Sequence, residues 1–162
     1  MENAIVSLIA DGLVIPVALI GAWALVFKVP AKRRYHAYAR VLMAGLTAFA
    51  FAKLIGAVFQ PELTRPFEQL GVEAGASFLN NPGFPSDHVL FCTAITLAVW
   101  FETRSRGIAA LLAVLTLLVA FGRVAALVHT PLDVVGGFAI AWIGALWYLQ
   151  TDSTKPQKTS TI

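Results

Sequence analysis

Five long apolar stretches divide this chain, and they constrain its fold more than any other feature of the sequence. They run approximately over residues 4–27, 35–59, 86–104, 107–128 and 131–149. A helix needs about 17–25 residues to cross the hydrocarbon core of a membrane, so each stretch can form one span. The third is the weakest because its strictly apolar part is short. The sequence therefore predicts an all-α membrane bundle of about five transmembrane helices.

The overall composition supports a single integral membrane domain. Of the 162 residues, 58% are hydrophobic and 13% are charged, whereas a soluble domain averages about 45–50% and about 25%. The first apolar stretch lacks a basic segment before it, so we expect a span and not a signal peptide. The single cysteine, Cys92, excludes an intrachain disulfide. We expect one transmembrane domain over residues 1–150 and a disordered polar tail over 151–162.

The basic residues predict how the chain is oriented in the membrane. Nine of the twelve lie in the connections near 28–40 and 102–106 or in the tail. They are Lys28, Lys32, Arg33, Arg34, Arg40, Arg104, Arg106, Lys155 and Lys158. The positive-inside rule makes this side cytoplasmic, which places the N-terminus outside and the C-terminus inside. The net charge of +3 thus reflects topology, and we expect no nucleic-acid partner.

Ionisable and polar residues gather at the helix ends predicted to lie on the outer side. They are Lys53, Arg65, Ser86, Asp87, His88, Arg123, His129 and Asp133. Charged groups near a membrane are costly unless they are paired or hydrated, so such a group indicates a functional site. Arginine binds phosphate oxygens with two parallel donors, lysine adds a point charge, and a helix N-terminus adds backbone N–H groups. This combination predicts an anion site with proton transfer, for which phosphate is the natural ligand.

Three short motifs in this set carry a resemblance to a known family. Residues 85–88 read Pro-Ser-Asp-His, and Arg123 is followed after five residues by His129 and after three more by Asp133. Together with Arg65-Pro66, in this order, the motifs resemble those of the type-2 phosphatidic acid phosphatases. The resemblance covers about residues 50–135 and implies a helical membrane phosphatase domain.

The resemblance also implies catalytic roles. His129 would be the nucleophile that attacks phosphorus and forms a phosphohistidine. Asp133 would accept a hydrogen bond from the other ring nitrogen, either along one helical face or from the first turn of a helix that starts at Pro131. His88 would protonate the leaving oxygen and then activate water.

The remaining polar residues would bind the phosphate. Arg65, Arg123 and Ser86 would hold its equatorial oxygens, and Lys53 would approach from inside the second span. We expect no metal and no other cofactor, because these cations supply the positive charge. A metal site would need clustered carboxylates or more histidines, and the one histidine outside this set, His36, lies on the predicted cytoplasmic side.

The chain departs from the family motifs at three positions. Gly122 stands where a serine usually precedes the arginine, and Asp87 stands where glycine is usual. Eleven residues separate Lys53 from Arg65 instead of the usual six, so a lysine that snorkels to the interface is an equal alternative. We interpret Asp87 as an N-cap of the third span. Asp11, in the first span, is interpreted as a helix-end or inter-helix polar group.

The connection over residues 60–85 contains a helical pattern. Phe67, Leu70, Ala74 and Phe78 recur at helical spacing, which predicts a short amphipathic helix at the outer interface.

Small residues form two stripes, one at Ala48, Ala52 and Gly56 and the other at Gly137, Ala141 and Ala145. Such stripes allow close helix contact, either within one chain or across a homodimer.

These observations lead to a lipid phosphatase with its site on the extracytoplasmic face, in a bacterial inner membrane. The substrate would be a phosphate monoester or diphosphate whose tail stays among the membrane lipids. By resemblance a polyprenyl diphosphate is favoured over phosphatidylglycerol phosphate, phosphatidate or a lipid A phosphate. The alternative is a catalytically inactive relative that binds or transports lipid phosphates. A soluble vanadate-binding peroxidase with a similar pocket is disfavoured by the five spans.

Overall fold

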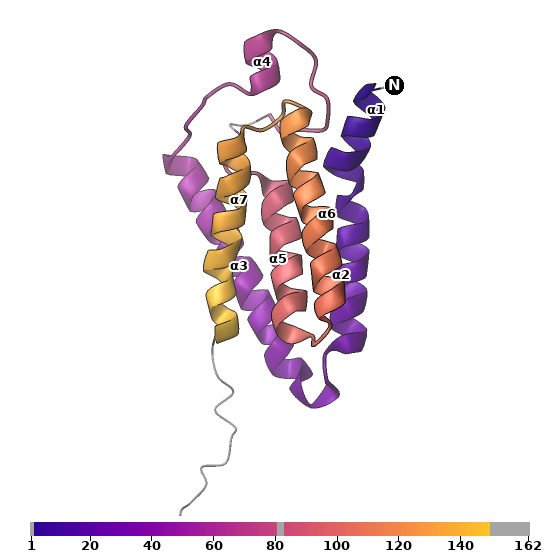
Figure 1. Cartoon of the computed structure of the whole chain (residues 1–162). Helices are drawn as coiled ribbons and strands as arrows, with labels where there is room; N and C mark the ends of the chain where they lie inside the picture. The colour runs from indigo at the N-terminus through magenta and orange to yellow at the C-terminus, as the bar shows by residue number, and fades with distance from the viewer. Residues whose placement is uncertain (1, 81–82, 150–162) are drawn as a thin grey trace, which may run out of the picture.

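The computed structural model describes residues 2–80 and 83–149, and these form helices and connecting segments without strands (Figure 1). The helical elements are α1 (Glu2–Ser7), η1 (Leu8–Gly12), α2 (Val14–Lys28), η2 (Ala31–Arg33), α3 (Arg34–Val58), α4 (Pro66–Leu70), α5 (Asp87–Glu102), α6 (Arg106–Ala125), α7 (Pro131–Gly144) and η3 (Ala145–Leu149). The predicted all-α class is confirmed. The tail predicted to be disordered lies outside the described residues.

Four helical segments of the described chain are long and apolar enough to cross a membrane. They cover Ala4–Lys28, Ala31–Val58, Arg106–Ala125 and Pro131–Leu149. The third predicted span, over residues 86–104, corresponds to α5, which has 16 residues and is not among these four. At 1.5 Å per residue such a helix is about 24 Å long, shorter than the hydrocarbon core of about 30 Å. A fifth crossing therefore stays a prediction.

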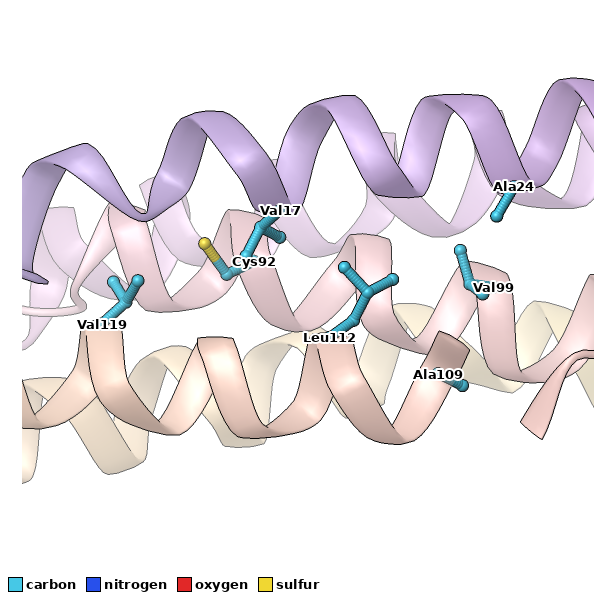
Figure 2. Close-up of a cluster of buried hydrophobic side chains, with 7 residues drawn as sticks. All are labelled: Val17, Ala24, Cys92, Val99, Ala109, Leu112 and Val119. Carbon is cyan, nitrogen blue, oxygen red and sulfur yellow. The ribbon is translucent and has the colours of Figure 1, made fainter. Parts of the chain in front are cut away.

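Helix α5 lies at the centre of the bundle, in contact with α2, α3, α6 and α7 (Figure 1). Figure 2 shows one of its contact regions, where Val17, Cys92, Val99 and Leu112 meet from α2, α5 and α6. On the outer faces of the bundle, large apolar side chains are exposed; Leu19, for example, is 66% exposed. Exposed apolar side chains on the outer surface are expected when that surface faces lipid instead of water.

Helices α3 and α7 approach each other through small residues. Ala48, Ala52, Ala141 and Ala145 belong to one buried cluster, so the two predicted stripes pack against each other within the chain. The approach is closest at Gly144, where an added Cβ would lie 2.3 Å from the Ala44 carbonyl oxygen. The structure thus confirms the stripes as intramolecular contacts, and the homodimer stays an untested prediction.

The two ends of the bundle differ in charge. The connections from α2 to α3 and from α5 to α6 lie at one end, where Arg40 donates from Nε to Glu102 Oε1 at 2.6 Å (Figure 1). This end carries Lys28, Lys32, Arg33, Arg34, Arg104 and Arg106. The turn from α6 to α7 lies at the other end, together with the connection from α3 to α5 (Figure 1). The predicted separation of basic residues from the polar site is therefore present.

The connection from α3 to α5 folds over the end of α6 and α7 (Figure 1). The helix predicted from the spacing of Phe67 to Phe78 is wrong beyond Leu70, because Gly71 adopts φ of 65° and ends α4 there. The chain then continues without a helix, and Gly75 N donates to Ala126 O at 3.0 Å. Phe67 and Phe78 nevertheless contact each other, with their ring centroids 4.8 Å apart.

Candidate active site

A cavity of about 400 Å³ lies at the end of the bundle that carries the α6–α7 turn. Among its lining residues are Lys53, Arg65, Asp87, His88, Arg123 and His129, which come from α3, the α3–α5 connection, α5, α6 and the α6–α7 turn. Six of the eight polar residues singled out in the sequence thus line one cavity. The other two are buried and are not among the lining residues: Asp133 contacts His129, and Ser86 lies between the lining residues Pro85 and Asp87.

His129 and Asp133 form a buried pair at the start of α7. Helix α6 ends at Ala125, earlier than the predicted 128, and the intervening turn contains Leu127 at φ of 59°. Helix α7 begins at Pro131, so Asp133 occupies its first turn, the second of the two predicted arrangements. Asp133 Oδ2 lies 3.4 Å from His129 Nδ1, and each side chain is at most 7% exposed.

A capping box fixes the position of Asp133. Thr130 is the N-cap of α7, and its Oγ1 accepts from Asp133 N at 3.2 Å. Asp133 Oδ2 in turn accepts from Thr130 N at 2.8 Å. The same carboxylate oxygen therefore caps the helix and faces the imidazole, which ties the orientation of His129 to the helix start.

The environment of His129 favours a neutral imidazole. Burial lowers the pKa of His129 below its ordinary value, the Asp133 contact opposes this shift, and the positive charges of Arg123 and Arg65 reinforce it. A neutral ring with Asp133 beside Nδ1 leaves Nε2 with a free electron pair. This is the form that can act as a nucleophile.

Arg65 is buried against the turn that carries His129. Its Nη2 donates to Leu79 O at 3.1 Å, and its Nη1 donates to the carbonyl oxygen of Val128. The side chain also stacks over the Phe78 ring, 5.5 Å from its centroid. Burial lowers the pKa of Arg65, an effect that nearby carboxylates oppose, but a guanidinium stays protonated at physiological pH. Arg65 thus brings a fixed positive charge close to His129.

Gly83 lies directly against the pair of His129 and Asp133, and sequence reasoning missed it. An added Cβ would be 3.0 Å from Asp133 Oδ2, 3.4 Å from His129 Nδ1 and 3.6 Å from Arg65 Nη1. The neighbouring backbone is braced by Gln60, whose Nε2 donates to Phe84 O at 3.0 Å. Only the general association of loop glycines with close backbone approach could have pointed to Gly83.

Ser86 connects the start of α5 to the start of α7. It is the N-cap residue of α5, is fully buried, and donates from its backbone N to Asp133 O at 3.0 Å. Its Oγ is buried and makes no hydrogen bond within the described chain. A buried hydroxyl without a partner is costly, so its presence beside the cavity indicates a ligand contact.

Lys53 and Asp87 form an ion pair at the cavity wall. Lys53 Nζ lies 3.1 Å from both carboxylate oxygens of Asp87, and the side chains are 50% and 39% exposed. The interpretation of Asp87 as the N-cap is wrong, because Ser86 takes that position and Asp87 is the first residue of α5. The predicted phosphate contact of Lys53 would have to compete with this carboxylate.

Arg123 is held by a residue from the first helical segment. Its side chain is 2% exposed, Nη1 donates to Asp11 Oδ1, and Nη2 donates to Ser77 O at 2.8 Å. Its Nε is buried and makes no hydrogen bond to any described residue. Asp11 Oδ1 also lies 3.5 Å from His88 Nε2. The interpretation of Asp11 as an inter-helix polar group is confirmed, and its place at the site is new.

The site is built for an anion. It combines two buried guanidinium groups, two imidazoles, the N-terminus of α5 and a hydroxyl, Ser86 Oγ, that has no hydrogen-bond partner among the described residues. Within the described residues, no group of three or more His, Cys, Asp or Glu side chains is placed to hold a metal ion. The geometry suits binding of a tetrahedral anion with proton transfer by the imidazoles.

Comparison with known proteins identifies similar chains. The model of the PAP2 superfamily matches residues 34–156. The chain is 35% identical over 121 residues to undecaprenyl-diphosphatase BcrC of Bacillus subtilis (strain 168), covering 72% of this chain and 60% of the relative. It is 38% identical over 87 residues to "Putative undecaprenyl-diphosphatase YbjG" of Escherichia coli (strain K12), covering 51% and 41%. The matches thus span less than two thirds of either relative. No solved structure gives a significant match.

Proposed function

The chain belongs to the PAP2 superfamily, and from this membership we propose that it is an integral membrane lipid phosphatase. The observation that carries the proposal is the cavity in which a buried His129–Asp133 pair, His88 and two guanidinium groups meet. An ion-pair network that only stabilises the fold would not need two imidazoles next to Ser86 Oγ and Arg123 Nε, two donors without a hydrogen-bond partner among the described residues. The arrangement is the one that phosphoryl transfer needs.

The reaction would proceed in two displacements at phosphorus. His129 Nε2 attacks phosphorus and forms an N–P bond while the P–O bond to the leaving group breaks. The electron pair goes to the leaving oxygen, which takes a proton from His88. Asp133 stabilises the positive charge that develops on the His129 ring, as a carboxylate does in a hydrolase triad.

Water completes the cycle. His88, now neutral, accepts a proton from a water molecule whose oxygen attacks phosphorus, and the N–P bond breaks with its electron pair returning to His129. The products are inorganic phosphate and a lipid alcohol or lipid monophosphate. Arg65, Arg123 and Ser86 would hold the phosphoryl oxygens through both steps. The proposal uses no metal ion and no other cofactor.

Among lipid phosphates, a polyprenyl diphosphate is the substrate that we favour. The names of two relatives, one in Bacillus subtilis and one in Escherichia coli, specify undecaprenyl diphosphate. The cavity opens at one end of an apolar bundle, so a phosphate group can enter it while the lipid tail stays in the bilayer. We place this end on the extracytoplasmic side of a bacterial inner membrane, because the basic connections lie at the other end.

A second candidate is a catalytically inactive relative that binds or transports lipid phosphates. It is favoured by the two carboxylates that offset the cations at the cavity, Asp87 with Lys53 and Asp11 with Arg123. Because the carboxylates neutralise part of the positive charge, Lys53 and Arg123 attract a phosphate group less strongly than cations without such partners would. Turnover distinguishes the two functions.

The first test is phosphate release by protein purified in detergent. The substrates would be a polyprenyl diphosphate, phosphatidylglycerol phosphate, phosphatidate and a lipid A phosphate, each with and without EDTA. We expect EDTA-resistant turnover that His129→Ala lowers by about 10³-fold or more, because the nucleophile is lost. His36→Ala is the matched control, since His36 is exposed at the opposite end of α3.

Trapping provides a second measurement. Protein quenched during turnover of a ³²P-labelled substrate should carry an acid-labile, alkali-stable label that His129→Ala lacks. Absence of turnover on every lipid, with His129→Ala and the unmodified protein indistinguishable, would overturn the enzyme and support the inactive relative. Turnover that EDTA abolishes would overturn the metal-free mechanism.

A further inference from the structure

The segment η1 departs from the α-helix in which it lies, and this places one carboxylate at the site. Leu13 N donates to Leu8 O at 3.1 Å, a spacing of five residues that defines a π-turn. Such turns inside α-helices are rare and occur frequently at functional sites. Asp11 lies in this turn, and its carboxylate is directed at Arg123, 112 residues away in the sequence.

The contacts of Asp11 form a closed arrangement with Arg123 and Ser77. Asp11 Oδ1 accepts from Arg123 Nη1, and Asp11 Oδ2 accepts from Ser77 N at 2.8 Å. Ser77 O in turn accepts from Arg123 Nη2 at 2.8 Å. Two of the three guanidinium nitrogens are therefore fixed by the protein, and Nε is the one left without a partner among the described residues.

The same carboxylate faces the second histidine of the site. Asp11 Oδ1 lies 3.5 Å from His88 Nε2, and the Asp11 side chain is 26% exposed. Asp11 is not among the residues that line the cavity, whereas Ser77, His88 and Arg123 are. Its action on a bound phosphate would thus pass through its neighbours.

Gly122 is the residue that admits this segment. A Cβ at Gly122 would lie 2.8 Å from Ala10 N and 2.9 Å from Ala10 Cα. Both are backbone atoms of η1, so any larger residue at position 122 would push the segment away from α6. Gly122, which replaces the usual serine of the motif, and Asp11 thus belong to one structural unit.

We propose that Asp11 is a positioning residue that fixes Arg123 and His88 and limits how tightly the site holds phosphate, and that Gly122 is required for its placement. The proposal rests on the proposed phosphatase function. The carboxylate offsets part of the Arg123 charge, which favours release of product phosphate, and it gives the protonated form of His88 a counter-charge. Residues 1–33, outside the matched family region, would thereby contribute to the reaction.

The decisive variant is Asp11→Asn, which keeps the side-chain shape and removes the charge. We expect kcat to fall about tenfold or more, and the inhibition constant of inorganic phosphate to fall about three- to tenfold, meaning tighter binding. A purely structural role would lower the active fraction without tightening phosphate binding. Thermal unfolding in detergent verifies that the variant is folded.

The variant Gly122→Ala keeps Asp11 and tests whether Gly122 is required for the placement of its carboxylate. We expect it to lower kcat and tighten phosphate binding as Asp11→Asn does, and the double variant to bind phosphate no tighter than Asp11→Asn alone. Gly107→Ala is the matched control, because it lies on the same helix and a Cβ there meets nothing within 4 Å.

The outcomes separate this inference from the proposed function. If Asp11→Asn turns over and binds phosphate as the unmodified protein does, the role of Asp11 is overturned; if Gly122→Ala alone behaves as unmodified, the role of Gly122 is overturned. If the unmodified protein turns over no lipid phosphate, the proposed function fails. In that case, thermal stabilisation by inorganic phosphate, compared between Asp11→Asn and the unmodified protein, still decides whether Asp11 limits phosphate binding.

Discussion

Each cation of the site has a partner that keeps it stable at the membrane boundary. Arg123 faces the Asp11 carboxylate, Lys53 faces Asp87, and Arg65 donates to backbone carbonyl oxygens. An isolated buried charge would cost several kcal/mol, so these contacts explain how the two arginines tolerate burial, whereas the Lys53–Asp87 pair stays partly exposed. Ser86 Oγ and Arg123 Nε are buried and make no hydrogen bond within the described chain, and under the proposed function a phosphate group would engage them.

The environment of His129 predicts how the phosphatase activity falls at acid pH. Burial lowers the pKa of His129 below the ordinary value of about 6.5, so the proposed nucleophile is mostly neutral at pH 6.5 and becomes protonated in more acidic solution. We expect kcat/KM to decline below pH 6.5, measured as phosphate release across a buffer series. An acid limb with its midpoint above pH 6.5 would contradict this assignment.

Glycines set how closely the helices approach. Gly144 brings α7 against α3, and Gly137 brings α7 against α5, where an added Cβ would lie 2.8 Å from Ser86 O. Because Ser86 is the N-cap of α5 and Asp133 lies in the first turn of α7, the spacing of these two helices also sets the distance between the site residues. Packing in the bundle and geometry at the site therefore depend on the same contacts.

The close contact of α3 with α7 can be tested by adding one methyl group at position 144. Gly144→Ala should lower stability by about 1–3 kcal/mol, because the new Cβ meets the Ala44 carbonyl oxygen and the helices must separate. Thermal unfolding in detergent measures the change. Gly45→Ala on α3 is the control, where nothing lies within 4 Å and stability should be unchanged or raised by up to about 1 kcal/mol. Equal effects of the two variants would contradict the packing argument.

The whole molecule separates a basic end from a site end. The described basic residues of the α2–α3 and α5–α6 connections lie at one end, and the cavity lies at the other (Figure 1). A lipid phosphatase that works on one leaflet needs such polarity, because its phosphate site must face a single aqueous compartment. From the positive-inside rule we expect the basic end to be cytoplasmic.

This orientation predicts which positions a membrane-impermeant maleimide reaches in intact cells. In a Cys92→Ala background, Glu62→Cys should be labelled directly, since Glu62 is exposed at the site end. Lys32→Cys, exposed at the basic end, should be labelled only after the membrane is permeabilised. The reverse pattern would place the site in the cytoplasm.

Much of this protein follows from local sequence. Apolar stretches of spanning length determine the helices, because a membrane leaves backbone polar groups no partner except those within a helix. Thr130 and Pro131 mark the start of α7 by their own chemistry, and the spacing of His129 to Asp133 makes their contact a local matter. For these reasons the helical class and the contact of His129 with Asp133 were predictable, while their catalytic role stays a proposal.

Only the tertiary structure decided which distant groups meet. No periodicity relates Asp11 to Arg123, Asp87 to Lys53, or Gly83 to the catalytic pair, since each contact depends on how helices and loops pack in three dimensions. The sequence could mark Asp11 as unusual, because a carboxylate in an apolar span is costly without a partner. Its partner became evident only where the π-turn and Gly122 bring α6 against η1, because a close backbone approach is a property of two segments together.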